Sequence, residues 1–166
     1  MLTSANNFQT ENLFSIESEK ELIQSFRPID QKKLLFPAEL QFPLRISSYF
    51  TWKESSGVYT YLVFKKPNWD LPRGIVLKRA YQGVDAPTGR LCCWCNSYGS
   101  SEDIGMLSVA ASATVSAGYI LCKDLRCIEK IEEASTLAGK HPEDSIHKLY
   151  HRIGVFFELI SQYQPE

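Results

Sequence analysis

The sequence has no excess of charge of either sign. Eighteen Lys and Arg residues stand against nineteen Asp and Glu residues, which gives a net charge of −1. No global basic field therefore draws the chain to nucleic acid or acidic lipid, and a polyanionic partner would have to be recognised by a local patch. Internal repeats and low-complexity tracts are also missing. With 166 residues and 44% hydrophobic content, the chain is predicted to form one globular unit.

Signals for secretion and membrane insertion are equally scarce. Residues 1–14 carry no Lys or Arg and no apolar run of signal-peptide length, so we expect a cytoplasmic protein. Residues 104–122 contain no charged side chain, and the length of this segment is nearly sufficient to span a bilayer. Their many Gly, Ser and Thr residues make this segment too polar for a spanning helix, and we expect no membrane association.

Apolar spacing predicts an α+β fold with short N-terminal helices, an antiparallel sheet and a long C-terminal helix. The predicted N-terminal helices cover residues 17–26 and residues 31–36, the second capped by Asp30. Strands are predicted over residues 57–64, 74–81, 104–109 and 117–121, with turns at 65–68 and 85–89. The connections are too short for parallel crossovers. Helices are predicted over residues 128–134 and 142–163.

Five cysteines form two pairs and one single residue. Two residues separate Cys92 from Cys95, four separate Cys122 from Cys127, and twenty-six lie between the pairs. Cytoplasmic thiols stay reduced, so a disulfide framework is not expected. Zinc takes four soft ligands in a tetrahedron, and a C-x-x-C turn lets two sulfurs face one ion. We predict that Cys92, Cys95, Cys122 and Cys127 bind one structural zinc ion with no open position for catalysis.

The order of elements around these cysteines predicts a treble-clef finger. A hairpin knuckle carries the first pair, a β-hairpin follows, and the second pair is expected in the first turn of the next helix, where the dipole stabilises thiolates. Cys93 is predicted to be a buried apolar thiol that faces away from the metal. A thioredoxin-like redox pair at Cys92 and Cys95, or structural cysteines without metal, are the alternatives.

Other candidate sites are weaker. His147 and His151 share a helix face but lack an acidic or cysteine partner, so a solvated flank is predicted. The sequence shows no Gly-rich phosphate loop and no G-x-S-x-G motif, so neither an enzyme nor a small-molecule substrate is predicted.

We predict that residues 45–166 form a zinc-binding domain packed as a single unit, preceded by a tail and short helices over residues 1–44.

Positive charge is concentrated in the middle of the chain. Between residues 65 and 90, the acidic residues are Asp70 and Asp85. The basic residues are Lys65, Lys66, Arg73, Lys78, Arg79 and Arg90. Together with nearby aromatic residues, this composition is typical of surfaces that bind RNA or the ribosome. A sheet edge protected by cationic side chains is the alternative.

The cysteine-bearing segments resemble a known family. Residues 91–95, Leu-Cys-Cys-Trp-Cys, and residues 118–127, Gly-Tyr-Ile-Leu-Cys-Lys-Asp-Leu-Arg-Cys, resemble the signature of the FBP domain. This domain is the C-terminal treble-clef zinc finger of FusB-type elongation factor G-binding proteins. Residues 35–39 and Trp52 are similar to the segment that precedes the knuckle in this family, and the likeness spans about residues 20–163.

The resemblance implies a non-enzymatic partner of elongation factor G, the translocase of translation. Family members with fusidic acid resistance activity bind that factor and promote its release from the ribosome. The implied metal ligands are the four cysteines already predicted from their spacing. An RNA- or ribosome-binding zinc finger that acts without elongation factor G is the alternative function.

Overall fold

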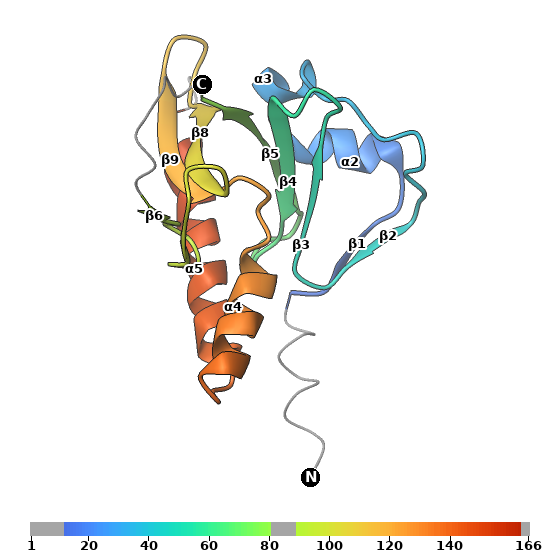
Figure 1. Ribbon diagram of the computed structural model, residues 1–166. Coiled ribbons are helices and arrows are strands. Elements are labelled where there is room, and N and C mark those ends of the chain that lie inside the picture. The colour runs from blue at the N-terminus through green and yellow to red at the C-terminus, as the bar shows by residue number, and fades with distance from the viewer. Residues whose placement is uncertain (1–11, 81–88, 164–166) are drawn as a thin grey trace. The chain divides into compact units, whose positions relative to one another are not determined.

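The computed structural model describes residues 12–80 and 89–163, and the chain divides into two compact units, residues 1–77 and 78–166 (Figure 1). The sequence predicted a boundary near residue 45 instead. Whether residues 45–166 pack as a single unit stays a prediction.

The first unit contains two antiparallel sheets and two short helices. Its elements are β1 (Phe14–Ile16), α2 (Glu19–Ser25), α3 (Pro28–Gln31), β2 (Leu44–Ile46), β3 (Tyr49–Lys53), β4 (Tyr59–Phe64) and β5 (Arg73–Arg79), of which the last two residues belong to the second unit. Strand β1 pairs with β2, and β3 pairs with β4 from Tyr49↔Phe64 to Lys53↔Thr60. Strand β5 lies on the other side of β4.

The predicted helix over residues 17–26 is confirmed as the shorter α2. Ser18 is its N-cap, since the Ser18 hydroxyl accepts a hydrogen bond from the Glu21 N–H at 3.2 Å. The Glu21 carboxylate accepts in turn from the Glu17 N–H at 2.8 Å. Phe26 is extended, so the helix ends at Ser25, three residues before Pro28.

The predicted helix over residues 31–36 is wrong. Helix α3 begins earlier, at Pro28, and Asp30 lies inside it instead of capping it. Proline suits the first helical position because its missing N–H has no intrahelical partner there. The carbonyls of Lys33 and Leu35 accept hydrogen bonds from Tyr61 Oη at 2.7 Å and Trp52 Nε1 at 2.8 Å. These tertiary hydrogen bonds hold residues 33–35 in a non-helical conformation.

An aromatic cluster forms the core of the first unit. Trp52 stacks on Tyr61 with ring centroids 4.8 Å apart, and the Phe26 ring meets Trp52 edge-on at 5.9 Å. A Cβ atom on Gly74 would lie 2.6 Å from the Phe26 ring, so glycine is required at this close approach. Both faces of β4 are buried, as its two apolar faces predict.

The second unit contains the cysteines. Its elements are the end of β5, β6 (Arg90–Leu91), β7 (Tyr98–Gly99), β8 (Ile104–Ala110), β9 (Ser116–Cys122), α4 (Cys127–Leu137) and α5 (Glu143–Ser161). Strands β8 and β9 have seven residues each and form an antiparallel hairpin, and β8 also pairs with the end of β5. The two predicted strands and two predicted helices of this region are confirmed with small shifts at their ends. Most of the predicted turn at 85–89 lies outside the described residues.

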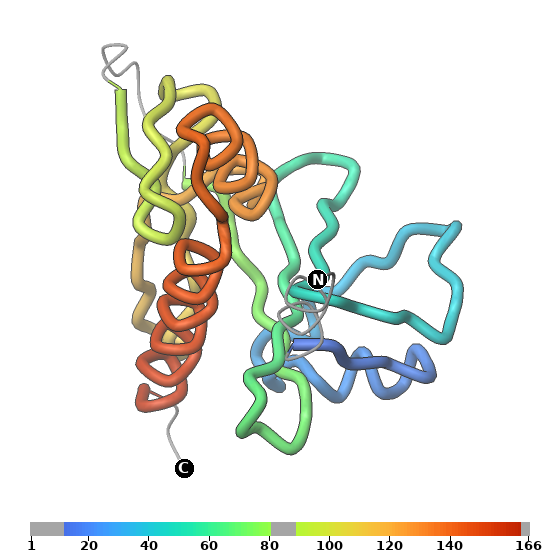
Figure 2. Tube along the Cα trace, turned by 90° about the horizontal axis from the view of Figure 1, so that it is seen from below, coloured from blue at the N-terminus to red at the C-terminus, as the bar shows by residue number. Residues whose placement is uncertain are grey.

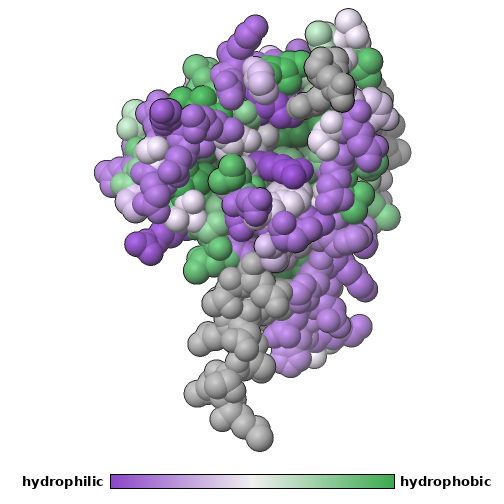
Figure 3. Space-filling model, turned by 180° about the vertical axis from the view of Figure 1, so that it is seen from behind, coloured by the Kyte–Doolittle hydropathy of each residue, from purple (hydrophilic) through white to green (hydrophobic). Residues whose placement is uncertain are grey.

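Helix α5 packs on the β8–β9 hairpin and on α4. Its apolar stripe is buried at Ile146, Leu149, Ile153, Phe156, Phe157 and Ile160. The Phe156 ring meets Tyr119 of β9 edge-on at 4.8 Å, and Figure 2 shows α5 running along this hairpin. Figure 3 shows that hydrophilic side chains cover much of the surface on the side turned away in Figure 1. The exposed residues of α4 include Glu129, Glu132 and Glu133.

Candidate metal centre

The first two cysteines lie in the tight turn between β6 and β7. These strands pair antiparallel with Leu91 opposite Tyr98. Inside the turn, the Cys92 N–H donates to Ser97 O at 3.0 Å, and the Asn96 N–H donates to Cys92 O at 2.9 Å. Asn96 has a φ of 59°, a left-handed conformation that asparagine tolerates better than most residues. This turn brings Cys92 and Cys95 to one side of the hairpin.

The other two cysteines flank the turn between β9 and α4. Cys122 is the last residue of β9, and Cys127 is the first residue of α4. The expectation that both sulfurs lie in the first helical turn is therefore correct for Cys127 alone. Between them, Leu125 has a φ of 54°, and its N–H donates to Cys122 O at 3.1 Å. The Leu125 side chain is buried, and its burial offsets the cost of this backbone conformation.

The four cysteine sulfur atoms lie close together in one cluster. Cys92 Sγ lies 3.8 Å from Cys127 Sγ, and Cys95 Sγ lies 3.6 Å from Cys122 Sγ. All four atoms lie within 4.8 Å of one another. Zinc–sulfur bonds of about 2.3 Å in a tetrahedron would place the sulfurs about 3.8 Å apart. The arrangement therefore fits a tetrahedral zinc ion.

Burial and backbone hydrogen bonds prepare the cluster for thiolates. Cys92, Cys122 and Cys127 are fully buried, and Cys95 is half-buried. The N–H groups of Trp94 and Cys122 each donate to Cys92 Sγ at 3.4 Å. Such donors stabilise the charge of a coordinating sulfur and fix its direction.

Neighbouring sulfurs shift the acidity of the cysteine side chains in opposite directions. Hydrogen bonds from the Cys122 and Cys127 side chains lower the pKa of Cys92 to about 7, and the same partners lower the pKa of Cys95. The contact with Cys122 raises the pKa of Cys127. Four thiolates this close would repel one another, so a divalent cation at their centre is needed to stabilise all four.

A lysine on α4 adds positive charge beside the cluster. Burial alone would lower the pKa of Lys130, but the Cys122 side chain and the Asp124 carboxylate together raise it. Lys130 Nζ lies 3.5 Å from Asp124 Oδ1, which also accepts a hydrogen bond from the Arg126 N–H at 3.0 Å. Zinc bound to four thiolates carries a net charge of −2, and Lys130 offsets part of it.

Helix α5 supports the knuckle from behind. Arg152 Nη1 donates to Trp94 O at 2.8 Å, and the Trp94 ring meets Phe156 edge-on at 5.3 Å. The sequence analysis missed this support. The Trp inside the C-x-x-C turn was the available signal, because an aromatic residue between two ligands needs a surface to pack on.

The remaining sulfur and imidazole groups lie outside the cluster. Cys93 is exposed, so the prediction that it is buried is wrong, although it does face away from the metal site. His147 and His151 are exposed on α5, as predicted for a solvated flank. Among the residues that the structure describes, the four cysteines form the sole group of three or more potential metal ligands.

The C-x-x-C segment lies in a hairpin turn. A thioredoxin-like redox pair requires this segment at the start of a helix, so the turn argues against the redox alternative.

The six basic residues that were predicted to contact a partner are divided between the two units. Lys65, Lys66 and Arg73 lie in the first unit, where the Arg73 guanidinium sits 4.0 Å from the centre of the Trp69 ring. Lys78, Arg79 and Arg90 lie in the second. Burial, and then the charges of Arg79 and Arg90, lower the pKa of Lys123 in the same unit.

A knuckle, a β-hairpin and a helix that together carry four clustered cysteines define a treble-clef zinc finger, and the four cysteines are its zinc site. Residues 20–160 match the FBP C-terminal treble-clef zinc-finger family, and the chain belongs to that family. A search of curated proteins gave no match. The family is one of binding modules and not of catalysts. Over the described residues, no helix has the length and apolar character needed to cross a bilayer.

Proposed function

We propose that this protein is a zinc-binding adaptor that binds elongation factor G and influences its release from the ribosome. The observation that carries the proposal is the family match over residues 20–160 together with the four-cysteine site inside that span. The adaptor makes and breaks no covalent bond. Its binding energy favours the conformation of elongation factor G that leaves the ribosome.

The zinc ion has a structural role in this proposal. Four thiolates fill the coordination sphere of zinc, so no position remains for a substrate or an activated water. The ion joins the β6–β7 hairpin to the start of α4, two segments that are separated in the sequence by the β8–β9 hairpin. Metal binding in comparable fingers contributes roughly 10 to 16 kcal/mol of folding free energy. A surface built on these segments therefore depends on the metal.

The knuckle presents side chains that suit a protein partner. Leu91 and Tyr98 lie opposite each other on β6 and β7, and they are 58% and 74% exposed. Tyr is one of the residue types enriched at the energetic centres of interfaces, and Leu91 adds apolar contact area beside Tyr98. The cations Lys78, Arg79 and Arg90 of the same unit would complement an acidic groove on the factor.

A binding measurement with purified elongation factor G tests the proposal. The zinc-loaded chain should bind the immobilised factor, and Tyr98→Ala should weaken binding by about tenfold or more because a central aromatic contact is lost. Cys122→Ser should abolish binding, since it removes a metal ligand. Cys93→Ser and His147→Ala are the matched controls, and both should bind like the wild type.

Two results would contradict the adaptor. One is a wild-type chain that carries one zinc ion per molecule and does not bind the factor. The other is full binding by zinc-free, unfolded Cys122→Ser protein, because the docking surface would then not depend on the metal.

A ribosomal RNA site is the second candidate. It is favoured by Arg73, which stacks on the Trp69 ring next to Lys65 and Lys66. RNA affinity would fall steeply with salt, with a slope set by the number of phosphates contacted. Titration of elongation factor G and of ribosomal RNA over the same salt series separates the two candidates, and Lys65→Glu with Lys66→Glu should weaken RNA binding alone.

A further inference from the structure

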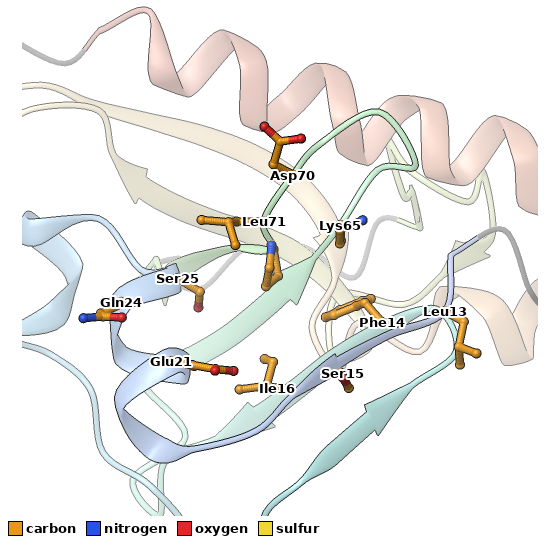
Figure 4. Close-up of a pocket in the computed structure, with 11 residues that line it drawn as sticks. Leu13, Phe14, Ser15, Ile16, Glu21, Gln24, Ser25, Lys65, Asp70 and Leu71 are labelled. Atoms are coloured by element: carbon orange, nitrogen blue, oxygen red, sulfur yellow. The ribbon is translucent and has the colours of Figure 1, made fainter.

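A cavity of about 540 Å³ lies within the first unit, away from the cysteines. Three segments line it: β1 with the preceding Leu13, helix α2, and the connection between β4 and β5 (Figure 4). Phe14 and Ile16 of β1 and Leu71 and Pro72 of the connection give it an apolar lining. The metal site and the proposed docking surface use none of these residues.

The cavity lies beside β1, a strand with one edge that carries no partner strand among the described residues. Strand β1 pairs with β2 in a two-stranded sheet. Residues of β1 line the cavity and no residue of β2 does, so the cavity lies beside β1 and not between the two strands. An unpaired strand edge offers a row of backbone N–H and C=O groups to which an extended segment can add.

Two exposed leucines stand at the cavity. Leu13 is 58% exposed and Leu71 is 74% exposed, and they come from segments far apart in the sequence. Figure 4 places them on opposite sides of Phe14. An added strand would therefore find apolar contacts for its side chains on both sides, in addition to the backbone edge.

The charges at the cavity select the kind of strand. Glu21 and Asp70 line it, with Lys65 as the single cation among its lining residues. Hydrogen bonds from the Glu17 N–H and at the helix cap hold Glu21 in place. Asp70 has no hydrogen bond or ion pair with another described residue. The excess of negative charge favours a segment with basic residues beside an apolar one.

We propose that this cavity binds an extended peptide segment of a partner protein, with an aliphatic residue flanked by Lys or Arg, by addition to the free edge of β1. The backbone edge supplies the hydrogen bonds, Leu13 and Leu71 contact the aliphatic side chain, and Asp70 with Glu21 attracts the basic side chains. The proposal does not depend on elongation factor G binding, since it concerns the first unit.

A fluorescein-labelled peptide Lys-Val-Leu-Val-Lys and its Glu-Val-Leu-Val-Glu counterpart test the proposal by fluorescence anisotropy with the full zinc-loaded chain. The lysine peptide should bind at least about tenfold more tightly than the glutamate peptide, and methylation of alternate backbone nitrogens should remove binding because strand addition needs N–H donors. Asp70→Lys should reverse the charge preference.

Leu71→Asp should weaken binding of the lysine peptide by about tenfold. Its matched control is Leu137→Asp, at a leucine of α4 that is 90% exposed in the other unit, which should bind like the wild type. Absence of binding by the wild type, equal affinity for the two charged peptides, or undiminished binding of the methylated peptide would each overturn the proposal.

Discussion

A single buried carboxyl links pH to the stability of the first unit. Asp30 is 0% exposed, and Arg27 Nε donates to Asp30 Oδ2 at 2.7 Å. Burial raises the pKa of Asp30 above its usual value of 3.8, although the Arg27 charge acts in the opposite direction. The folded state therefore holds this proton more tightly than the unfolded state does. The resulting stability is present below pH 3.8 and is lost as pH rises through the raised pKa.

Asp30→Asn is expected to lower the free energy of unfolding by about 1 to 3 kcal/mol, because the carboxyl group that accepts the Arg27 hydrogen bond is lost. The difference between wild type and variant should narrow as pH rises from about 4, because only the wild type loses the contribution of a protonated carboxyl. Urea unfolding of both proteins across a pH series measures this difference. Glu39→Gln, at an exposed position, is the control for the loss of one negative charge. A gap that widens with pH would contradict the assignment.

At the level of elements, helix α5 holds the zinc knuckle through one side chain. Arg152 donates to the Trp94 carbonyl between the two knuckle cysteines. Arg152→Ala is expected to destabilise the second unit by about 1 to 3 kcal/mol, since it removes a charged hydrogen bond. It should also speed the transfer of zinc to a chelator, because the knuckle is less constrained. Lys148→Ala, on an exposed face of the same helix, is the matched control. Equal transfer rates for Arg152→Ala and wild type would show that α5 does not support the site.

The elements differ in how far the sequence could predict them. Helix α5 was predictable because it carries a long apolar pattern at helical spacing. The strands β1, β2 and β3 were missed, since β1 and β2 have three residues each and β3 is a short aromatic segment. Three residues cannot establish a period of two. Strand β1 also pairs with a segment that is distant in sequence, since Phe14 lies opposite Ile46 of β2.

In the metal site, the residues defined by a local sequence motif were predictable, and the residues brought in by tertiary packing were not. The four ligands were predictable because zinc coordination demands particular residue types at short spacings. Arg152 lies 58 residues from Trp94, and no local pattern connects them. The exposure of Cys93 was also unpredictable, because a thiol beside a knuckle can face either a core or solvent. Tertiary packing decides such positions.

For the whole molecule, the two compact units predict two separate responses to metal removal. The core of the first unit is built from Leu22, Phe26, Trp52 and Tyr61, and no cysteine belongs to it. The second unit joins its knuckle to α4 through the cysteines. Loss of zinc leaves close buried thiols without the ion that stabilises them, and the expected result is unfolding of the second unit while the first stays folded.

Hydrogen exchange with mass spectrometry, before and after chelation, distinguishes this outcome from the domain boundary that the sequence predicted. Amides of β8, β9 and α4 should lose protection on chelation, and amides of β3 and β4 should keep it, because Trp52 and Tyr61 pack on α2 and not on the metal site. If residues 45–166 form one cooperative unit, β3 and β4 would lose protection together with β9. Cys93→Ser should behave like the wild type before and after chelation, whereas Cys127→Ser should resemble the chelated protein without any chelator.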